Sequence, residues 1–427
     1  MQFRRMLPFL SLAILLAVAA SAQNSTVPGA PSSWRPDPLH KFGPPPPRSS
    51  AAQKGERIIY RPAITEMKLL TQTSGWALAG GKTIYWTDDD GAHWKDITPP
   101  NVTSGRFNTP PFASVFFFDR DTGLALASNY LKGGDFGSLD LYSTSNGGES
   151  WAKTHIAVSE SDPERPFTGG SMSFADPQHG WLNMGIMSGS AFSIGELFRT
   201  SDGGQTWNRV KGDPGVGGEI RLVTAEDGWL AGGPANTELY ASHDGGKSFQ
   251  QVRLGAPKAL GPMNYPTYTL PVFENDLHGY EAVTYAGIGE AKGIAVLFET
   301  KDGGKTWKQD GVLTNLDRVS VGVSAISTVV DSKWMIPAVP ETGEPILTVL
   351  PSGGTETAQA DTMVGGMSGR KISFLSPSQG WLSCSKGLLS TTDGGATWTE
   401  ITPGKHPTDW FRVPKAMATP SVNPGRL

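Results

Sequence analysis

An eight-residue pattern that places a carboxylate between two hydroxyl groups recurs six times along this 427-residue chain. In residues 300–307 it reads Thr-x-Asp-x-Gly-x-Thr-Trp. Such a carboxylate could serve in acid–base chemistry, but it can also accept backbone N–H groups two and three residues on and close a turn. Repetition in six units favours the structural role. The copies span residues 87–94, 144–151, 200–207, 242–249, 300–307 and 391–398.

Three copies depart from the pattern at single chemical positions. His93 replaces the second hydroxyl of the first copy, Asn146 replaces the aspartate of the second, and Phe249 replaces the tryptophan of the fourth. The glycine supplies positive φ at little steric cost, and the tryptophan buries a large ring that keeps a polar N–H. We therefore interpret each copy as a staple of a hairpin.

Basic and aromatic residues between the repeats are the candidates for binding. Arginine recognises carboxylates through paired hydrogen bonds, and exposed tyrosine rings can stack on a ligand. Arginines that enter one channel mouth from several units would form a patch that recognises anions or carboxylates. The predicted binding residues are Arg106, Arg165, Arg221, Arg318, Arg370, Tyr265 and Tyr268.

The elements that must position these residues are short strands. A second signature, Gly-Trp-Leu or a relative, precedes most octapeptides, and β-rich runs surround it, as in residues 171–174, 181–184, 196–199 and 207–210. This pattern predicts four strands per unit and no helix of amphipathic length.

The spacing of the octapeptides predicts the number of units. Successive copies begin 57, 56, 42, 58 and 91 residues apart, and the last step is about twice a single unit. Residues 319–350 carry strand-like runs at 319–326, 327–330, 334–338 and 346–350 without an octapeptide, so we interpret them as one degenerate unit. The sequence therefore predicts an all-β fold, a seven-bladed β-propeller of four-stranded antiparallel blades over residues 57–403, rather than a solenoid with polar caps.

Propeller geometry divides these features between two faces. If the strands of each blade run A to D outward, both signatures lie in A–B and C–D turns and share one face. The B–C and D–A loops are long and dissimilar, and binding residues collect in such loops. We therefore expect the five arginines to converge on the loop face and to bind a polypeptide.

The octapeptide resembles the Asp-box, or bacterial neuraminidase repeat, of β-propeller proteins. Together with Gly-Trp-Leu, it resembles the repeats of photosystem II assembly and stability factors over about residues 65–403. That resemblance implies an exported propeller without catalytic residues or cofactors, which binds a membrane-associated or exported protein partner.

Two glycan-directed alternatives remain. Tyr60-Arg61-Pro62 resembles the sialidase Phe/Tyr-Arg-Ile-Pro motif, but the isoleucine is missing. Xyloglucan-cleaving glycosidases also carry Asp-boxes, but their cleft lies between two propellers and this chain has residues for one. A carbohydrate-binding propeller without catalysis would use Tyr265 and Tyr268 as stacking platforms. We expect no hydrolase activity.

The two ends of the chain lie outside the repeats. Residues 1–22 have the charged start, apolar run and Ala-Ser-Ala site of a cleaved export signal, and residues 23–56 form a Pro-rich linker. Residues 404–427 form a tail. Either residues 410–413 or residues 58–60 could pair with an edge and help to close the ring.

Composition excludes several function classes. Loss of Arg4 and Arg5 with the signal takes the 36 basic residues to 34 against 40 acidic ones, a formal charge of −6, which argues against a nucleic-acid partner. The single cysteine, Cys384, allows no intrachain disulfide and is expected to be a buried small side chain. No Cys/His cluster has zinc-ligand spacing, so no metal is predicted. A monomer is expected.

Overall fold

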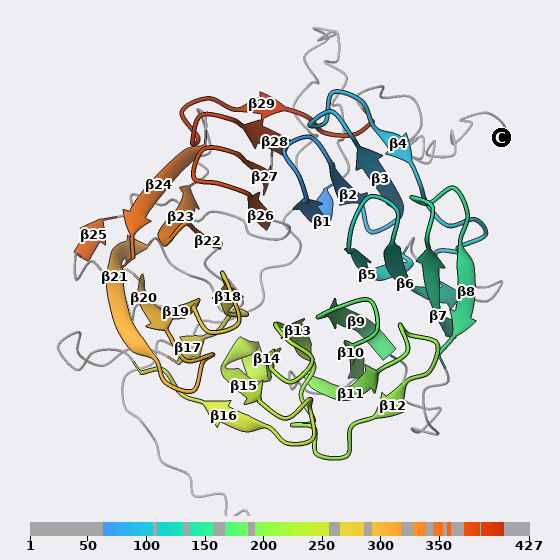
Figure 1. Cartoon of the computed structure of the whole chain (residues 1–427), viewed down its shortest axis with the longest axis horizontal. Helices are drawn as coiled ribbons and strands as arrows, with labels where there is room; N and C mark the ends of the chain where they lie inside the picture. The colour runs from blue at the N-terminus through green and yellow to red at the C-terminus, as the bar shows by residue number, and fades with distance from the viewer. Residues whose placement is uncertain are drawn as a thin grey trace, which may run out of the picture. The chain divides into compact units, whose positions relative to one another are not determined.

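The computed structural model describes residues 63–105, 109–130, 136–156, 167–186, 193–255, 265–285, 293–316, 328–338, 345–352, 357–359, 371–384 and 386–404. All of them belong to one compact unit, Ile59–Leu427. They form a seven-bladed propeller, and the sheets follow one another around a common axis (Figure 1). The predicted fold class is confirmed.

The first four blades are regular antiparallel sheets in which chain order is also sheet order. Blade 1 contains β1 (Ile64–Leu69), β2 (Gly75–Ala79), β3 (Thr83–Thr87) and β4 (Lys95–Asp96). Blade 2 contains β5 (Phe112–Phe117), β6 (Gly123–Tyr130), β7 (Phe136–Thr144) and β8 (Ala152–His155). Blade 3 contains β9 (Phe167–Phe174), β10 (Gly180–Ile186), β11 (Ile194–Thr200) and β12 (Asn208–Arg209). Blade 4 contains β13 (Gly218–Leu222), β14 (Gly228–Gly232), β15 (Glu238–Ser242) and β16 (Gln250–Val252).

The remaining blades include the unit without an octapeptide. Blade 5 contains β17 (Pro266–Thr267), β18 (Val272–Phe273), β19 (Gly279–Tyr285), β20 (Gly293–Thr300) and β21 (Lys308–Leu316). Blade 6 contains β22 (Thr328–Val330), β23 (Lys333–Ala338) and β24 (Ile346–Pro351). Blade 7 contains β26 (Lys371–Phe374), β27 (Gly380–Cys384), β28 (Gly387–Thr391) and β29 (Thr399–Glu400).

Blade 6 confirms the predicted unit without an octapeptide. Three of its expected strand-like runs, at 327–330, 334–338 and 346–350, coincide with β22, β23 and β24, and β22 pairs with β23. The expected first strand at 319–326 lies outside the described residues. Beyond β24, β25 (Thr357–Gln359) pairs in parallel with β21 of blade 5.

The Gly-Trp-Leu signature packs neighbouring blades together. Its tryptophans, such as Trp229 and Trp381, are fully buried on the second strands. A Cβ on Gly228 would lie 2.5 Å from the ring of Trp181 in the preceding blade, so only glycine permits this approach. The signature therefore joins blade 4 to blade 3, and Gly75 beside Trp381 joins blade 1 to blade 7 in the same way.

Side chains of the first and last blades close the ring. Leu69 N donates to Ser373 Oγ (3.1 Å), Trp94 Nε1 donates to the Ile401 carbonyl (2.7 Å), and Ser383 Oγ donates to the Ile64 carbonyl (3.1 Å). The segments expected to help closure, 58–60 and 410–413, lie outside the described residues.

Helical structure is scarce in the described ranges. They contain a 3₁₀ turn, η2 (Pro234–Asn236), and none of their helices has the length and apolar character needed to cross a membrane. Cys384, expected to be buried, is half-buried at the end of β27.

Candidate functional site

The octapeptide carboxylates are occupied by their own turns. Thr306 donates both its backbone N–H (2.9 Å) and its hydroxyl (2.6 Å) to Asp302, and Thr300 Oγ1 donates to the same carboxylate (2.9 Å). The donors expected for this carboxylate lay two and three residues on, whereas the main donor, Thr306, is four residues on. The N–H two residues on, that of Gly304, is taken by the hydroxyl of Thr300 instead (2.9 Å).

These hydrogen bonds favour the ionised form of the aspartates. The hydroxyl and backbone N–H of Thr306 lower the pKa of Asp302 to about 2. Equivalent donors lower the pKa of Asp202, Asp244 and Asp393 to about 2. An acid that ionises at this pH is a poor proton donor at neutrality, so the octapeptides act as structural staples.

Both signatures share one face, as predicted. The first glycine of each regular octapeptide donates its N–H to a carbonyl of the A–B turn in its own blade, as Gly203 does to Gln178 (3.0 Å) and Gly394 to Ser378 (2.8 Å). We call this side the Asp-box face and the opposite side the loop face.

The predicted binding residues are placed only in part. Arg106, Arg165, Arg318 and Arg370 lie outside the described residues, as does Tyr60-Arg61-Pro62, so convergence of the five arginines stays a prediction. Tyr265 is 83% exposed. Tyr268 is not a stacking platform: it is 4% exposed, and its hydroxyl accepts Leu254 N (3.1 Å) inside the core.

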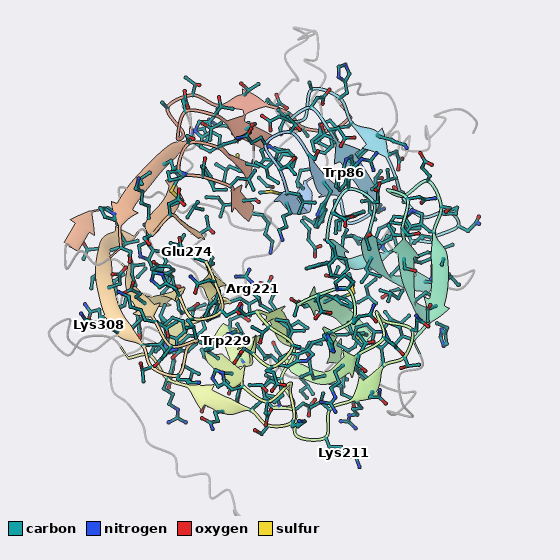
Figure 2. The ribbon with its side chains drawn as sticks, viewed as in Figure 1. Trp86, Lys211, Arg221, Trp229, Glu274 and Lys308 are labelled. Carbon is teal, nitrogen blue, oxygen red and sulfur yellow. The ribbon has the colours of Figure 1, made fainter. Side chains whose placement is uncertain are left out.

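Arg221 lies toward the centre of the ring, whereas Lys211 and Lys308 lie on its outer edge (Figure 2). Arg221 projects from β13, and its guanidinium donates to the Pro271 carbonyl of blade 5 (2.6 Å). Burial lowers the pKa of Arg221, against the opposing fields of Glu219 and Glu281. A carboxyl group near this guanidinium would meet a fixed donor.

Other charged side chains gather with Arg221 around the axis. We call the group formed by Glu66, Lys68, Glu219, Arg221 and Lys371 the axis cluster. Lys371 Nζ of blade 7 lies 3.2 Å from Glu219 Oε1 of blade 4. Because these blades are not neighbours in the ring, this ion pair spans the axis.

The surroundings of the axis cluster shift the pKa values of Glu66 and Lys68. Burial raises the pKa of Glu66 to about 7, although its carboxylate accepts Val115 N (2.9 Å) from blade 2. Burial, with a smaller contribution from Arg221, lowers the pKa of Lys68. Burial therefore disfavours the charged forms of both side chains.

Glu281 supports the cluster from the second strand of blade 5. It is 1% exposed and accepts the backbone N–H (3.1 Å) and hydroxyl (3.3 Å) of Thr269. Burial raises its pKa well above the usual range, and its Oε2 has no hydrogen-bond partner among the described residues.

Sequence reasoning found Arg221 but missed the charged residues beside it on the innermost strands. Glu66 and Lys68 occupy alternate positions of β1, as Glu219 and Arg221 do on β13. A charged residue at every second position of an innermost strand is the signal that could have found them, since one face of that strand points to the axis.

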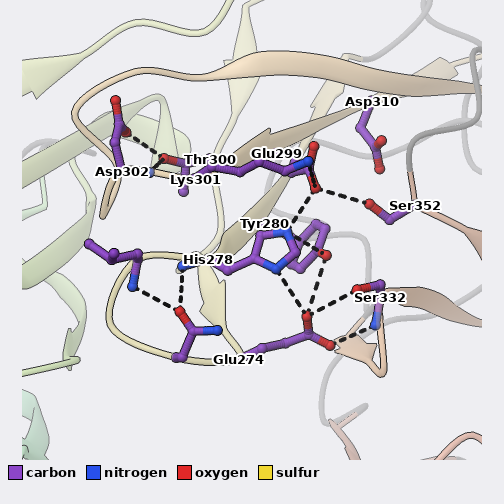
Figure 3. A network of polar contacts seen from close by, with 12 residues as sticks. Glu274, His278, Tyr280, Glu299, Thr300, Lys301, Asp302, Asp310, Ser332 and Ser352 are labelled. Atoms are coloured by element: carbon purple, nitrogen blue, oxygen red, sulfur yellow. Dashed lines mark hydrogen bonds and ion pairs between the residues drawn. The ribbon is translucent and has the colours of Figure 1, made fainter.

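A second polar network lies on the Asp-box face between blades 5 and 6 (Figure 3). The His278 ring lies between two carboxylates, 2.7 Å from Glu299 Oε1 and 3.5 Å from Glu274 Oε2. Tyr280 OH lies 2.9 Å from His278 Nε2, and Ser332 N of blade 6 donates to Glu274 (2.7 Å).

These residue types could do acid–base chemistry, but the network is saturated. Burial raises the pKa of Glu299, yet contacts from His278 and Lys301 together outweigh it and the net shift is downward. The network replaces the missing octapeptide of blade 6 with direct contacts from blade 5, which indicates a structural joint. Among the described ranges, no group of three or more His, Cys, Asp or Glu side chains could hold a metal ion.

Comparisons with known proteins show the fold alone. No protein-family model and no curated protein sequence matches the chain. A GH74 xyloglucanase from Xanthomonas campestris superposes with a TM-score of 0.54 at 14% identity, over 81% of this chain and 55% of that enzyme. The chain thus spans about half the length of that enzyme. YCF48 from Cyanidioschyzon merolae gives a TM-score of 0.43 at 19% identity, over 72% and 88% of the two chains. YCF48 bound to D1 peptide gives 0.38 at 18% identity, over 68% and 81%.

Proposed function

We propose that this protein is an exported, non-catalytic β-propeller that acts as a protein-binding scaffold or assembly factor. Its partner is a membrane-associated or exported polypeptide, which places charged side chains at the loop-face end of the axis cluster. The observation that carries this proposal is the ion pair between Lys371 and Glu219 across the axis.

The position of this pair supports binding from the loop face. Lys371 is the first residue of β26 and Glu219 the second of β13, and both strands begin where the chain enters from that face. Lys68 and Arg221 lie further along their strands, toward the Asp-box face. A ligand that enters from the loop face meets the pair first.

The ion pair between Lys371 and Glu219 is weak enough for charged groups of a partner to replace it. Its side chains are 43% and 64% exposed, and such pairs stabilise a fold by only about 0–1 kcal/mol. A partner's carboxylate and ammonium groups could replace the pair at little cost. The half-buried Arg221, fixed by Pro271, then offers a stronger contact below it.

Charge reversal tests the proposal. Lys371→Glu, Glu219→Lys and the double variant are compared in affinity capture from the native host envelope, with Lys211→Glu as an outer-edge control. The double variant restores the internal pair while it inverts the charges that a partner meets. We expect all three axis variants to lose the partner that the wild type and Lys211→Glu retain. Equal recovery by the double variant and the wild type would refute the proposal.

A glycoside hydrolase is the second candidate, and one observation favours it. Glycosidases use a carboxylic acid that is protonated near neutrality together with a second carboxylate, and Glu66, with its pKa of about 7, stands in one cluster with Glu219. Incubation with xyloglucan and sialosides separates the two functions. We expect no turnover. Turnover that Glu66→Gln abolishes would establish the hydrolase instead.

A further inference from the structure

A groove of about 660 Å³ lies on the Asp-box face at the seam where blade 7 meets blade 1. Its first wall is the octapeptide of blade 1, with His93 and Trp94. Its second wall is the last hairpin of blade 7, with Thr392, Thr399 and Glu400. The volume falls in the usual range for small-ligand sites. The groove is separate from the axis cluster.

The octapeptide of blade 1 differs from the others at two positions, and both differing residues line this groove. Asp90 stands where the other five copies have glycine, and His93 stands where they have serine or threonine. The His93 side chain is 90% exposed, and its Nδ1 lies 2.6 Å from Asp89 Oδ2. The second ring nitrogen therefore remains available to a ligand.

Hydroxyl groups supply further unused hydrogen-bonding capacity. Thr392 and Thr399 are exposed, and neither hydroxyl makes a hydrogen bond with any described residue. Thr397, by contrast, already donates its hydroxyl to Asp393 (2.7 Å). Since each free hydroxyl can both donate and accept, the groove suits a ligand that does the same.

The charges of the groove restrict the class of ligand. Its described lining contains the carboxylates of Asp90 and Glu400 but no lysine or arginine, which disfavours phosphates and acidic sugars. Asp90 is already engaged, since Trp381 Nε1 (2.7 Å) and Ser390 Oγ (2.9 Å) both donate to it. Half-buried Trp94 adds an aromatic wall, the usual surface for the apolar face of a sugar ring.

We propose that this groove binds a neutral oligosaccharide. His93 and Thr399 hydrogen-bond to sugar hydroxyls from opposite walls, Glu400 accepts from them, and Trp94 packs against a ring. The site would bind a neutral glycan on the face opposite to the proposed protein partner, and it does not depend on that proposal.

The experiment is calorimetric titration of the full chain with cellotetraose, maltotetraose and chitotriose, with sialyllactose and inorganic phosphate as anionic probes. His93→Thr removes the imidazole but restores the hydroxyl that donates to aspartate in four of the other octapeptides. Thr399→Val removes one hydroxyl at nearly constant volume. Thr206→His places an imidazole in the octapeptide of blade 3, far from the groove, and serves as the matched control.

We expect saturable binding of at least one neutral oligosaccharide. His93→Thr and Thr399→Val should each weaken it about three- to tenfold, the range for one lost hydrogen bond, while Thr206→His binds as the wild type does. Thermal melts establish that the variants are folded. No binding of neutral sugars, wild-type affinity in both His93→Thr and Thr399→Val, or a preference for the anionic probes would each overturn the proposal.

Discussion

Asp90 should hold the propeller closed, and replacing it with glycine tests this directly. It adopts φ 52°, in the left-handed region, where the equivalent residue of every other octapeptide is glycine. Its carboxylate joins blade 1 to Trp381 and Ser390 of blade 7, 291 and 300 residues away in sequence. Hydrogen bonds between blades 1 and 7 therefore offset the backbone strain at Asp90.

The two contributions differ in size. Replacing Asp90 with glycine relieves about 1 kcal/mol of left-handed strain. It also removes two hydrogen bonds to a charged group, each worth about 1.5–3 kcal/mol, and leaves the Trp381 N–H without its acceptor. We expect a net loss of about 3 kcal/mol. With an unfolding entropy near 2.1 cal/mol/K per residue and about 340 residues, this lowers Tm by roughly 4 °C.

Thermal unfolding of Asp90→Gly and Asp90→Asn measures the effect. Asparagine keeps an acceptor for Trp381 and tolerates the left-handed conformation, so Asp90→Asn should lower Tm less than Asp90→Gly does. An unchanged or raised Tm for Asp90→Gly would refute the reasoning, since strain would then outweigh the clasp.

A complementary pair of variants tests the same geometry in other blades. The Trp229 indole N–H is buried without a partner among the described residues, and Gly303 of the next blade occupies the position that Asp90 has beside Trp381. Gly303→Asp therefore adds strain but offers an acceptor, and we expect a nearly neutral change in stability. Gly203→Asp, which follows a blade with Leu124 in place of the tryptophan, should cost about 1 kcal/mol. Equal losses in the two variants would contradict this explanation.

Three further outcomes follow from the described contacts. The pKa of Asp302 in the folded protein is lowered to about 2, so the ionised carboxylate contributes to folding stability above about pH 4. This contribution is lost as the pH falls through about 2, and Asp302→Asn should therefore flatten this part of the acid-unfolding profile. The pKa of Glu66 in the folded protein is raised to about 7, so the free energy of unfolding should fall as the pH rises from about 4.5 to 7. Glu66→Gln should abolish this fall in denaturant titrations. Gly246 has φ 82°, and a Cβ there would lie 2.9 Å from the ring of Trp181. Gly246→Ala should therefore lower the free energy of unfolding by about 2 kcal/mol in chemical denaturation, and a decrease of less than about 0.5 kcal/mol would show that the blades are loosely packed.

Features that repeat within each blade could be predicted from the sequence. The spacing of the octapeptides gave seven blades, and the shared position of both signatures gave the two faces, because each rule was applied to several copies. The degenerate blade was located as well, and three of its expected runs, at 327–330, 334–338 and 346–350, coincide with β22, β23 and β24.

Features that depend on contacts between distant blades could not be predicted. Lys371 and Glu219 are 152 residues apart, and only the closed ring brings them together. Tyr268 was mistaken for a surface ring because a residue beside a long loop can still turn its side chain into the core, where its hydroxyl bonds Leu254. Asp90 escaped notice because the octapeptide pattern leaves its position unspecified.

Site-specific photocrosslinking tests the central proposal most directly. A benzophenone amino acid replaces Lys371 at the axis or Lys211 on the outer edge, and each protein is irradiated in the native host envelope. The account predicts that position 371 captures a discrete polypeptide that position 211 does not. Capture of the same species from both positions, or from position 211 alone, would contradict binding at the axis cluster.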